Sequence, residues 1–345
     1  MAQSTVPMFS AQTFAKLSPH PYMLANLKPS DPSRPSQRTN GRQPKQSRTL
    51  QVNTSSLTHA NGSAMVRLGD TTVICAVRAE SLPVTEIPNY RPASSTGPPL
   101  DEIASYDLLV PNIELATGSA PEFLPGVPPT ALAQTLSTRL YSLLLSSGMV
   151  QVDDLRIWEK SEDDNDDNME DGDGDGDQEL GTVPETPGRT LRGYWALFID
   201  VTFASYDGNP FDAAWIAVLA ALHNMKLPRA WWDADMEMVV CSPEGSEFQK
   251  LHLEGFPVSC TAAVVTERDH AEHSVGKYWV LTDPDRREEK LCDESICMVV
   301  DCSRRGDTKI LNLSKAGGCE LDKALINEFR QTAENRWQDC RAALE

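Results

Sequence analysis

The stretch from Asp207 to Leu222, which reads DGNPFDAAWIAVLAAL, constrains the fold of this chain most strongly. The residues before it, 194–205 (YWALFIDVTFAS), have the composition of a strand, and the Asp-Gly pair predicts a tight turn. Asn209 is placed to cap a helix, and Pro210 suits the first helical position, where its missing N–H costs nothing. The sequence therefore predicts a strand that passes through a turn into an apolar helix.

This order of elements is suited to holding a phosphate group. Free N–H groups and the helix dipole at a helix N-terminus both attract anions. Here Pro210 removes one donor, Phe211 offers no polar side chain, and Asp212 adds a negative charge in the first turn. Asn209, Pro210 and Phe211 therefore indicate a degenerate phosphate site.

The charge of the chain is acidic in total and uneven along its length. The formal net charge is −19 over 345 residues, and residues 162–177 hold ten carboxylates and no base. The first 50 residues instead carry seven basic side chains against Asp31 alone. This balance disfavours a protein that coats RNA unaided, although a local basic strip can still neutralise phosphates.

No targeting or membrane segment is expected from the sequence. The N-terminus lacks a charged start followed by an apolar core, and no run of 18 apolar residues occurs. The eight cysteines include no CxxC pair, which indicates reduced thiols in a cytosolic or nuclear protein.

We expect an N-terminal extended arm over residues 1–50, with a short helix near Phe9–Leu17, followed by one domain over residues 51–345. A disordered acidic insert is expected at about residues 160–185, because like charges and low hydrophobicity oppose folding.

Within the domain, the hairpin at Ser63–Val77 and a leucine-striped helix from Thr130 to Gly148 have the clearest patterns. A further helix is predicted at Leu321–Leu344. Strands are predicted at Tyr106–Leu115, Val150–Glu159, Met236–Cys241, Thr261–Val265, Tyr278–Leu281, Ile296–Asp301 and Lys309–Leu313. This order suggests an α+β domain with mixed sheets.

Two patterns that resemble metal sites are incomplete, so no metal and no other cofactor is expected. The acidic run opens like a calcium-binding loop at Asp171, but Thr182 stands where a bidentate Glu is required. His270 and His273 form an H-x-x-H pair without an evident third ligand.

Two other clusters have competing interpretations. The carboxylates between Asp283 and Glu294 suit either a catalytic pair or a solvated turn that pairs with Arg286, Arg287 and Lys290, and the turn is favoured. The segment 226–233 (KLPRAWWD) suits either stacking on single-stranded RNA or a subunit interface, and the interface is favoured.

Several of these segments together resemble the RNase PH family and, within it, the eukaryotic RNA exosome ring. Residues 38–42 (RTNGR) are similar to the R-x-D-G-R motif, and residues 62–77 to the first hairpin of that family. Residues 107–126 and the helix unit at 207–222 resemble the non-catalytic branch. The resemblance implies an RNase PH-like fold (ribosomal protein S5 domain 2-like), an α+β arrangement of mixed sheets with packed helices.

The resemblance also gives an expectation about activity. Active members have Gly-Thr-Arg at the start of the central helix, where Thr and Arg hold the attacking phosphate, whereas Asn209, Pro210 and Phe211 stand here. Two acidic residues six apart are also implied, and an ungapped match places them at Glu289 and Ser295. The chain is therefore expected to be no enzyme by itself. The alternative is an active phosphate-dependent 3′–5′ exoribonuclease that uses Glu289.

By the same resemblance, the expected function is a structural subunit of a six-membered ring that supports 3′–5′ RNA processing and degradation, including rRNA maturation and mRNA turnover. The implied partners are other RNase PH-like ring subunits, S1/KH cap subunits, a separate 3′–5′ ribonuclease and single-stranded RNA in the channel. The implied location is the nucleus, the nucleolus and the cytoplasm. The candidates for RNA or interface contact are Arg38, Arg42, Arg67 and Arg91.

Overall fold

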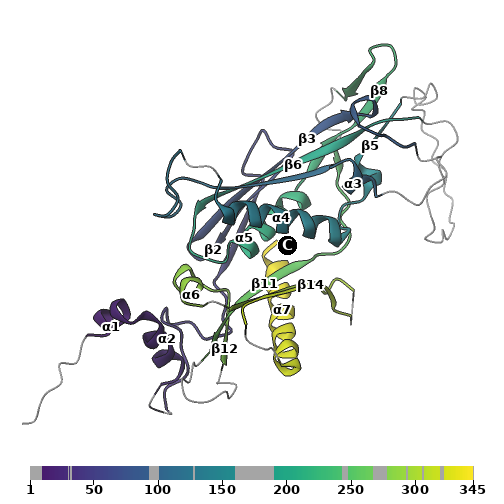
Figure 1. The fold of residues 1–345 in the computed structure, drawn as a ribbon. Coiled ribbons are helices and arrows are strands. Elements are labelled where there is room, and N and C mark those ends of the chain that lie inside the picture. Colours follow the sequence, from purple (N-terminus) through teal and green to yellow (C-terminus); the bar gives the residue numbers. More distant parts are fainter. Residues whose placement is uncertain are drawn as a thin grey trace, which may run out of the picture.

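The computed structural model describes the fold outside a few short gaps and one long one (Figure 1). The described residues are 10–29, 31, 33–92, 101–126, 129–159, 190–242, 248–266, 278–292, 294–304, 307–318 and 322–344. The acidic insert and the pair His270 and His273 lie outside these residues.

The larger sheet has six strands in the order β1-β2-β3-β6-β4, with β5 also paired to β6. All neighbours are antiparallel except β4, which runs parallel to β6. The second half of β2 and the first half of β3 alternate between buried and more exposed residues, as expected for strands with one face on the core. The strands are β1 (Leu50–Thr54), β2 (Gly62–Leu68), β3 (Thr71–Pro83), β4 (Leu109–Leu115), β5 (Arg156–Trp158) and β6 (Leu191–Ser205).

The smaller sheet is antiparallel and has the order β12-β11-β13-β14. Helix α7 (Lys323–Leu344) packs on β11 and β13, with Phe329 and Ala333 buried against this sheet. The strands are β11 (Val258–Thr266), β12 (Tyr278–Thr282), β13 (Glu294–Asp301) and β14 (Lys309–Ala316).

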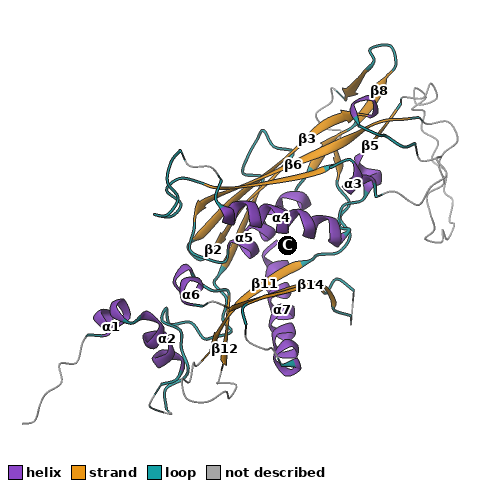
Figure 2. Cartoon of the chain, viewed as in Figure 1, coloured by secondary structure: helices purple, strands orange, loops and turns teal. Residues whose placement is uncertain are grey.

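Helix α5 (Pro210–His223) lies between the two sheets (Figure 2). It packs on β2 and β3 on one side and on β11 on the other, and every residue from Pro210 to Leu222 is buried. Trp215 donates its indole N–H to the carbonyl of Pro257 at 2.8 Å. A helix that is apolar all round needs such a position, because no side of it favours water.

Helix α4 (Ala131–Ser147) covers β4 and carries the predicted leucine stripe. Thr130 caps it by accepting a hydrogen bond from the Ala133 N–H, and Gly148 ends it in the left-handed conformation. Both ends of this helix are therefore specified by local sequence.

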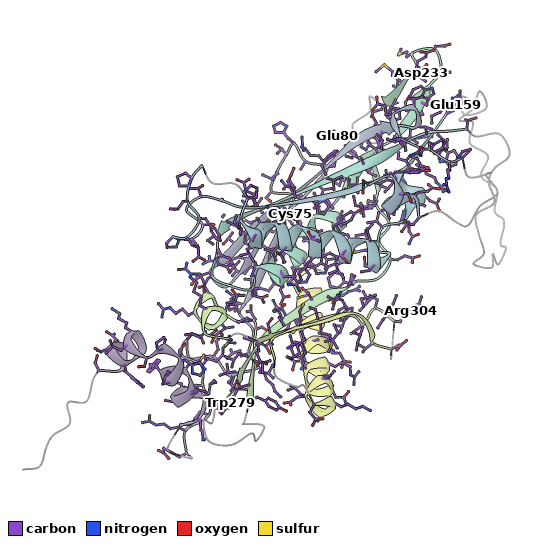
Figure 3. The ribbon with its side chains drawn as sticks, in the orientation of Figure 1. Cys75, Glu80, Glu159, Asp233, Trp279 and Arg304 are labelled. Carbon is purple, nitrogen blue, oxygen red and sulfur yellow. The ribbon has the colours of Figure 1, made fainter. Side chains whose placement is uncertain are left out.

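The remaining elements are short. Met23 and Leu27 of the second N-terminal helix are buried against Ala263, Val265 and Leu281 of the smaller sheet. Figure 3 places Asp233, on a two-stranded ribbon, and Trp279, on β12, at opposite ends of an elongated molecule. The short elements are α1 (Ala11–Leu17), α2 (Pro19–Leu27), α3 (Glu102–Ser105), α6 (Arg286–Leu291), η1 (Val84–Glu86), η2 (Val152–Leu155), β7 (Lys226–Pro228) paired with β10 (Phe248–Lys250), and β8 (Ala230–Asp233) paired with β9 (Met238–Cys241).

Most of the predicted elements are confirmed, with shifted ends. The prediction of one strand over Val150–Glu159 is wrong in part, since η2 occupies its first half and β5 only Arg156–Trp158. The N-terminal region is less extended than predicted, because it holds two helices rather than one. None of the described helices has the length and apolar character needed to cross a membrane.

Candidate functional site

The start of α5 is the centre of the candidate site. Gly208 and Asn209 both have positive φ, at 81° and 49°. This backbone turns the Asn209 N–H toward α6, where it donates to Glu289 Oε1 at 2.7 Å. The predicted side-chain cap is wrong, because Asn209 occupies the N-cap position without a capping hydrogen bond from its side chain.

The Asn209 side chain instead joins two carboxylates. Its Nδ2 donates to Asp212 at 2.9 Å and to Asp283 at 2.8 Å. Asp212 also accepts hydrogen bonds from the backbone and the hydroxyl of Thr261, both at 2.8 Å. The first turn of α5 is thus tied to β11 and to the loop before α6.

Asp283 is the buried carboxylate of this loop, and an arginine holds it. Arg48 donates to it from its backbone N–H, Nε and Nη2 at 2.7 to 2.9 Å. Burial opposes the charged form, but the hydrogen bonds and charge of Arg48, together with Asn209, outweigh it and lower the pKa of Asp283 to about 2. Asp283 is therefore ionised over the physiological pH range.

Glu289 has the opposite electrostatic state. It is partly buried, and it accepts a hydrogen bond from the Tyr206 hydroxyl at 3.0 Å as well as from Asn209. Burial raises the pKa of Glu289 to about 7, even though both hydrogen bonds favour the ionised form. Two carboxylates of one site thus have pKa values far apart.

Phe211 lies on the other side of the first turn. It is buried, and the guanidinium carbon of Arg139 from α4 lies 4.0 Å from the centre of its ring. This contact is a cation–π interaction. Arg139 of α4 therefore covers the Phe211 ring in the first turn of α5.

Ser295 is not part of this site. It lies in β13, where it pairs with Ala263 and Ala316. The carboxylate that the structure places beside Asn209 with Glu289 is Asp283, which is also six residues away in sequence. No hydrogen bond among the described residues joins Ser295 to Glu289, so the structure does not bring the predicted acidic pair together.

The acidic cluster after Asp283 is not a solvated turn with local pairing. Glu288 is 1% exposed and forms an ion pair with Arg38, which is 2% exposed. Arg38 also donates to the carbonyls of Thr282 and Asp283, at 2.6 and 3.1 Å. The segment around Arg38 therefore packs onto α6 and the loop before it, although the ion pair joins residues 250 positions apart in the sequence.

The four arginines proposed for RNA or interface contact divide into two pairs. The structure contradicts Arg38 as a contact residue, since its side chain is sequestered by Glu288. Arg42 is largely buried too and donates to the Asp283 carbonyl at 3.0 Å. Arg67 and Arg91 are exposed, and Arg67 lies 3.8 Å from Asp70. Only this second pair remains accessible to a partner.

The site also contains three residues that the sequence did not predict, namely Arg48, Tyr206 and Arg139. The sequence gave a signal for the start of α5, at residues 209–211, and for Glu289. The three missed side chains come from separate elements, and nothing local marks them.

The titration of Glu289 gives a measurable pH dependence of stability. Its folded pKa of about 7 is above the usual 4.5, so the folded chain binds the proton more tightly and loses stability as pH rises toward 7. Between pH 5 and pH 8, the wild-type chain should lose about 2–3 kcal/mol more unfolding free energy than Glu289→Gln. Urea unfolding at the two pH values measures this difference. Equal losses of unfolding free energy in the wild type and in Glu289→Gln would contradict the raised pKa of Glu289.

Residues 46–228 match the RNase_PH family, described as "3' exoribonuclease family, domain 1". The match spans more than half of the chain, so the chain belongs to this family. The resemblance to the RNase PH family that the sequence motifs indicated is therefore confirmed.

The relatives refine this result. The chain is 27% identical to "Exosome complex component rrp43" of Schizosaccharomyces pombe over 329 residues, which cover 95% of this chain and 96% of the relative. It is 24% identical to "Exosome complex component Rrp42" of Thermococcus onnurineus, over 84% of this chain and 83% of that protein. The resemblance to exosome components is confirmed by both.

A solved structure confirms the fold. A chain of the "archaeoglobus fulgidus exosome with RNA bound to the active site" is similar with a TM-score of 0.62 and 23% identity, over 94% of this chain and 97% of that chain. The predicted α+β, RNase PH-like fold is therefore correct.

Proposed function

We propose that this chain is a non-catalytic, structural subunit of an RNA exosome ring. Its role is to close the ring with other RNase PH-like subunits and to help form the channel through which single-stranded RNA passes. S1/KH cap subunits and a separate 3′–5′ ribonuclease complete the assembly, which works in the nucleus, the nucleolus and the cytoplasm. Membership of the family and two relatives named as exosome components support this proposal.

One observation carries the non-catalytic part of the proposal. The start of α5 is occupied by groups of the chain itself, since the Asn209 N–H donates to Glu289 and Arg139 covers the Phe211 ring. Pro210 has no N–H to offer. Phosphorolysis depends on positioning the attacking phosphate and stabilising its charge. A site that offers neither a Thr hydroxyl nor an Arg at these positions lacks that anchor.

The second candidate is an active phosphate-dependent 3′–5′ exoribonuclease. The pair Asp283 and Glu289 favours it, because the structure retains two carboxylates beside the start of α5. Against it, Asp283 is held by Arg48 and Asn209 and is not free to act on a substrate. We therefore favour the structural role.

A phosphorolysis assay separates the two candidates. The full-length chain is assembled with its ring neighbours and given labelled single-stranded RNA with and without inorganic phosphate. We expect Glu289→Gln to leave the amount of nucleoside diphosphate released by the assembly unchanged, whether or not the wild-type assembly releases any. This substitution keeps the acceptor for the Asn209 N–H but removes the carboxylate.

Phosphate-dependent release that falls at least about 100-fold in the Glu289→Gln assembly would support the enzyme. Native mass spectrometry of both assemblies is the control for composition. It should show this chain together with other RNase PH-like subunits, and its appearance as a free monomer under these conditions would contradict the ring role.

A further inference from the structure

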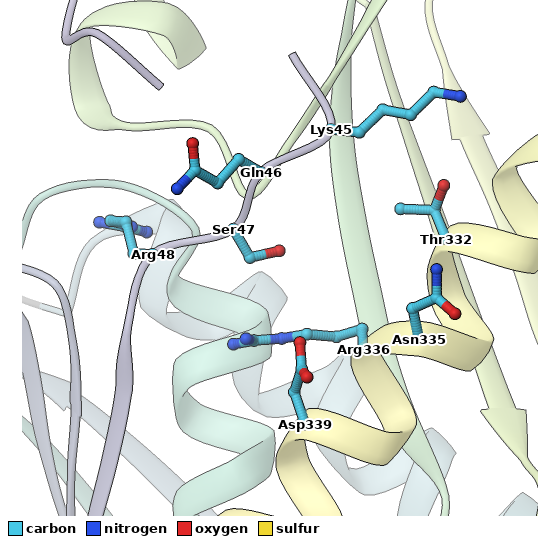
Figure 4. A pocket seen from close by; sticks show the side chains of 8 residues that line it. All are labelled: Lys45, Gln46, Ser47, Arg48, Thr332, Asn335, Arg336 and Asp339. Carbon is cyan, nitrogen blue, oxygen red and sulfur yellow. The ribbon is translucent and has the colours of Figure 1, made fainter. Parts of the chain in front are cut away.

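A polar pocket of about 280 Å³ lies between the N-terminal segment 45–48 and the helix α7. It adjoins the site at the start of α5, because Arg48 lines the pocket and also donates to Asp283 and to the Gly208 carbonyl. Its opposite wall comes from α7. Figure 4 shows Lys45, Ser47 and Arg48 along one wall and Thr332, Arg336 and Asp339 along the other.

Arg336 is the unusual residue of this pocket. It is 5% exposed, and its Nη2 is buried without a hydrogen-bond partner among the residues that the structure describes. In Figure 4 its side chain reaches from α7 toward the Ser47–Arg48 segment. A buried guanidinium usually has its donors satisfied, since leaving a charged donor unpaired costs more than leaving a neutral one.

The surroundings of Arg336 keep it charged. Burial opposes the charge, but the influence of Cys340, Asp283 and Asp212 more than offsets it and raises the pKa of Arg336. No hydrogen bond joins it to these carboxylates, which instead accept from Asn209, Thr261 and Arg48. The Arg336 side chain is thus charged, and its Nη2 has no acceptor among the residues that the structure describes.

The rest of the lining favours an anion. Lys45 and Arg48 add two cations to Arg336, while Asp339, which is exposed, is the one carboxylate of the lining. Lys45 pairs with Glu328 at the exposed rim, and Arg48 is directed to Asp283. Ser47 and Thr332 add hydroxyl groups, which donate readily to phosphate oxygens.

We propose that this pocket binds a phosphate group, either as inorganic phosphate or as a phosphodiester of RNA, with Arg336 as its main ligand. The pocket volume is several times that of one water molecule, so a group of phosphate size has room in it. The proposal concerns the pocket beside α7, which shares Arg48 with the site at the start of α5, and it holds whether or not the chain is catalytic.

Thermal unfolding and phosphate binding by the full-length chain test the proposal. Inorganic phosphate, compared with chloride at equal ionic strength, should raise the melting temperature of the wild-type chain, since a ligand that binds only the folded state stabilises it. Arg336→Gln should weaken phosphate binding about 10- to 100-fold, as expected for the loss of charged hydrogen bonds. Equilibrium dialysis with labelled phosphate measures this loss.

Two further variants keep the test decisive. Arg330→Gln, which lies on the same helix and pairs with Glu334, should bind phosphate as the wild type does. Asp339→Asn should bind it several-fold more tightly, because it removes a like charge from the pocket. This gain is expected even if Arg336→Gln fails to fold.

Competition identifies the source of the phosphate. A short single-stranded RNA that binds through Arg336 and is displaced by phosphate would assign the pocket to an RNA phosphodiester. Phosphate binding that RNA does not affect would assign it to the free ion. No stabilisation by phosphate, or equal stabilisation of the wild type and Arg336→Gln, would overturn the proposal.

Discussion

Arg38→Met should lower the free energy of unfolding of the full-length chain by about 3–5 kcal/mol. The substitution removes the cation that donates to the buried Glu288 carboxylate and leaves only the more distant Arg42, at 3.7 Å. It also removes donors from the carbonyls of Thr282 and Asp283. An uncompensated buried charge is among the most destabilising changes in a protein interior. Urea unfolding monitored by tryptophan fluorescence measures the loss.

A double variant and a surface control complete this experiment. Arg38→Met combined with Glu288→Met should recover about 1–3 kcal/mol relative to the sum of the single losses, because both charges are then absent. Lys290→Met breaks a well-formed but exposed pair with Glu122 and should cost less than about 1 kcal/mol. A loss from Arg38→Met as small as that from Lys290→Met would contradict the described burial of the pair.

Gly208→Ala should destabilise the chain by about 2–5 kcal/mol. Gly208 has a φ of 81°, which costs an L residue about 1 kcal/mol or more. A Cβ here would also lie 2.5 Å from the backbone of Asp285 and Arg286 and 2.8 Å from the Pro284 carbonyl. These atoms cannot rotate away as a side chain can, so the loop before α6 has to move.

Gly118 provides a matched control for this substitution. Its φ of 86° is close to that of Gly208, but a Cβ there would meet nothing within 4 Å. Gly118→Ala should therefore cost only the conformational part, about 1 kcal/mol. Equal losses from the two variants, measured by urea unfolding at one pH, would show that the close contact at Gly208 has no energetic weight.

The elements with local signals were predictable from the sequence. The leucine stripe with Thr130 and Gly148 specifies α4 at both ends, and the run after Pro210 specifies α5. Hydrophobic spacing and capping residues act within a few positions, so one sequence suffices to detect them.

The contacts of the N-terminal segment were not predictable in the same way. Arg38 and Glu288 are ordinary charged residues in a polar context, and their pairing depends on how the whole chain folds. A charged cluster by itself is typical of a solvated surface. The sequence therefore predicts a solvated turn after Asp283, whereas residues 38–48 pack on this cluster in the structure.

The site was predictable only in part, for a related reason. The loss of Thr and Arg at Pro210 and Phe211 is visible in the sequence, and so is Glu289. The backbone of Asn209 was not foreseen, because its left-handed conformation depends on Gly208 and on the carboxylates that hold its side chain and N–H. These partners come from another part of the chain.

The burial of α5 on every side bears on residues 46–228, the segment that matches the RNase PH family. The matched residues 46–228 end soon after this helix, whereas β11, the Pro257 carbonyl that receives the Trp215 indole, and the Asp283 partner of Arg48 all follow it. The matched segment thus lacks the residues that cover the β11 side of its own central helix, so we expect it to need the later part of the chain in order to fold.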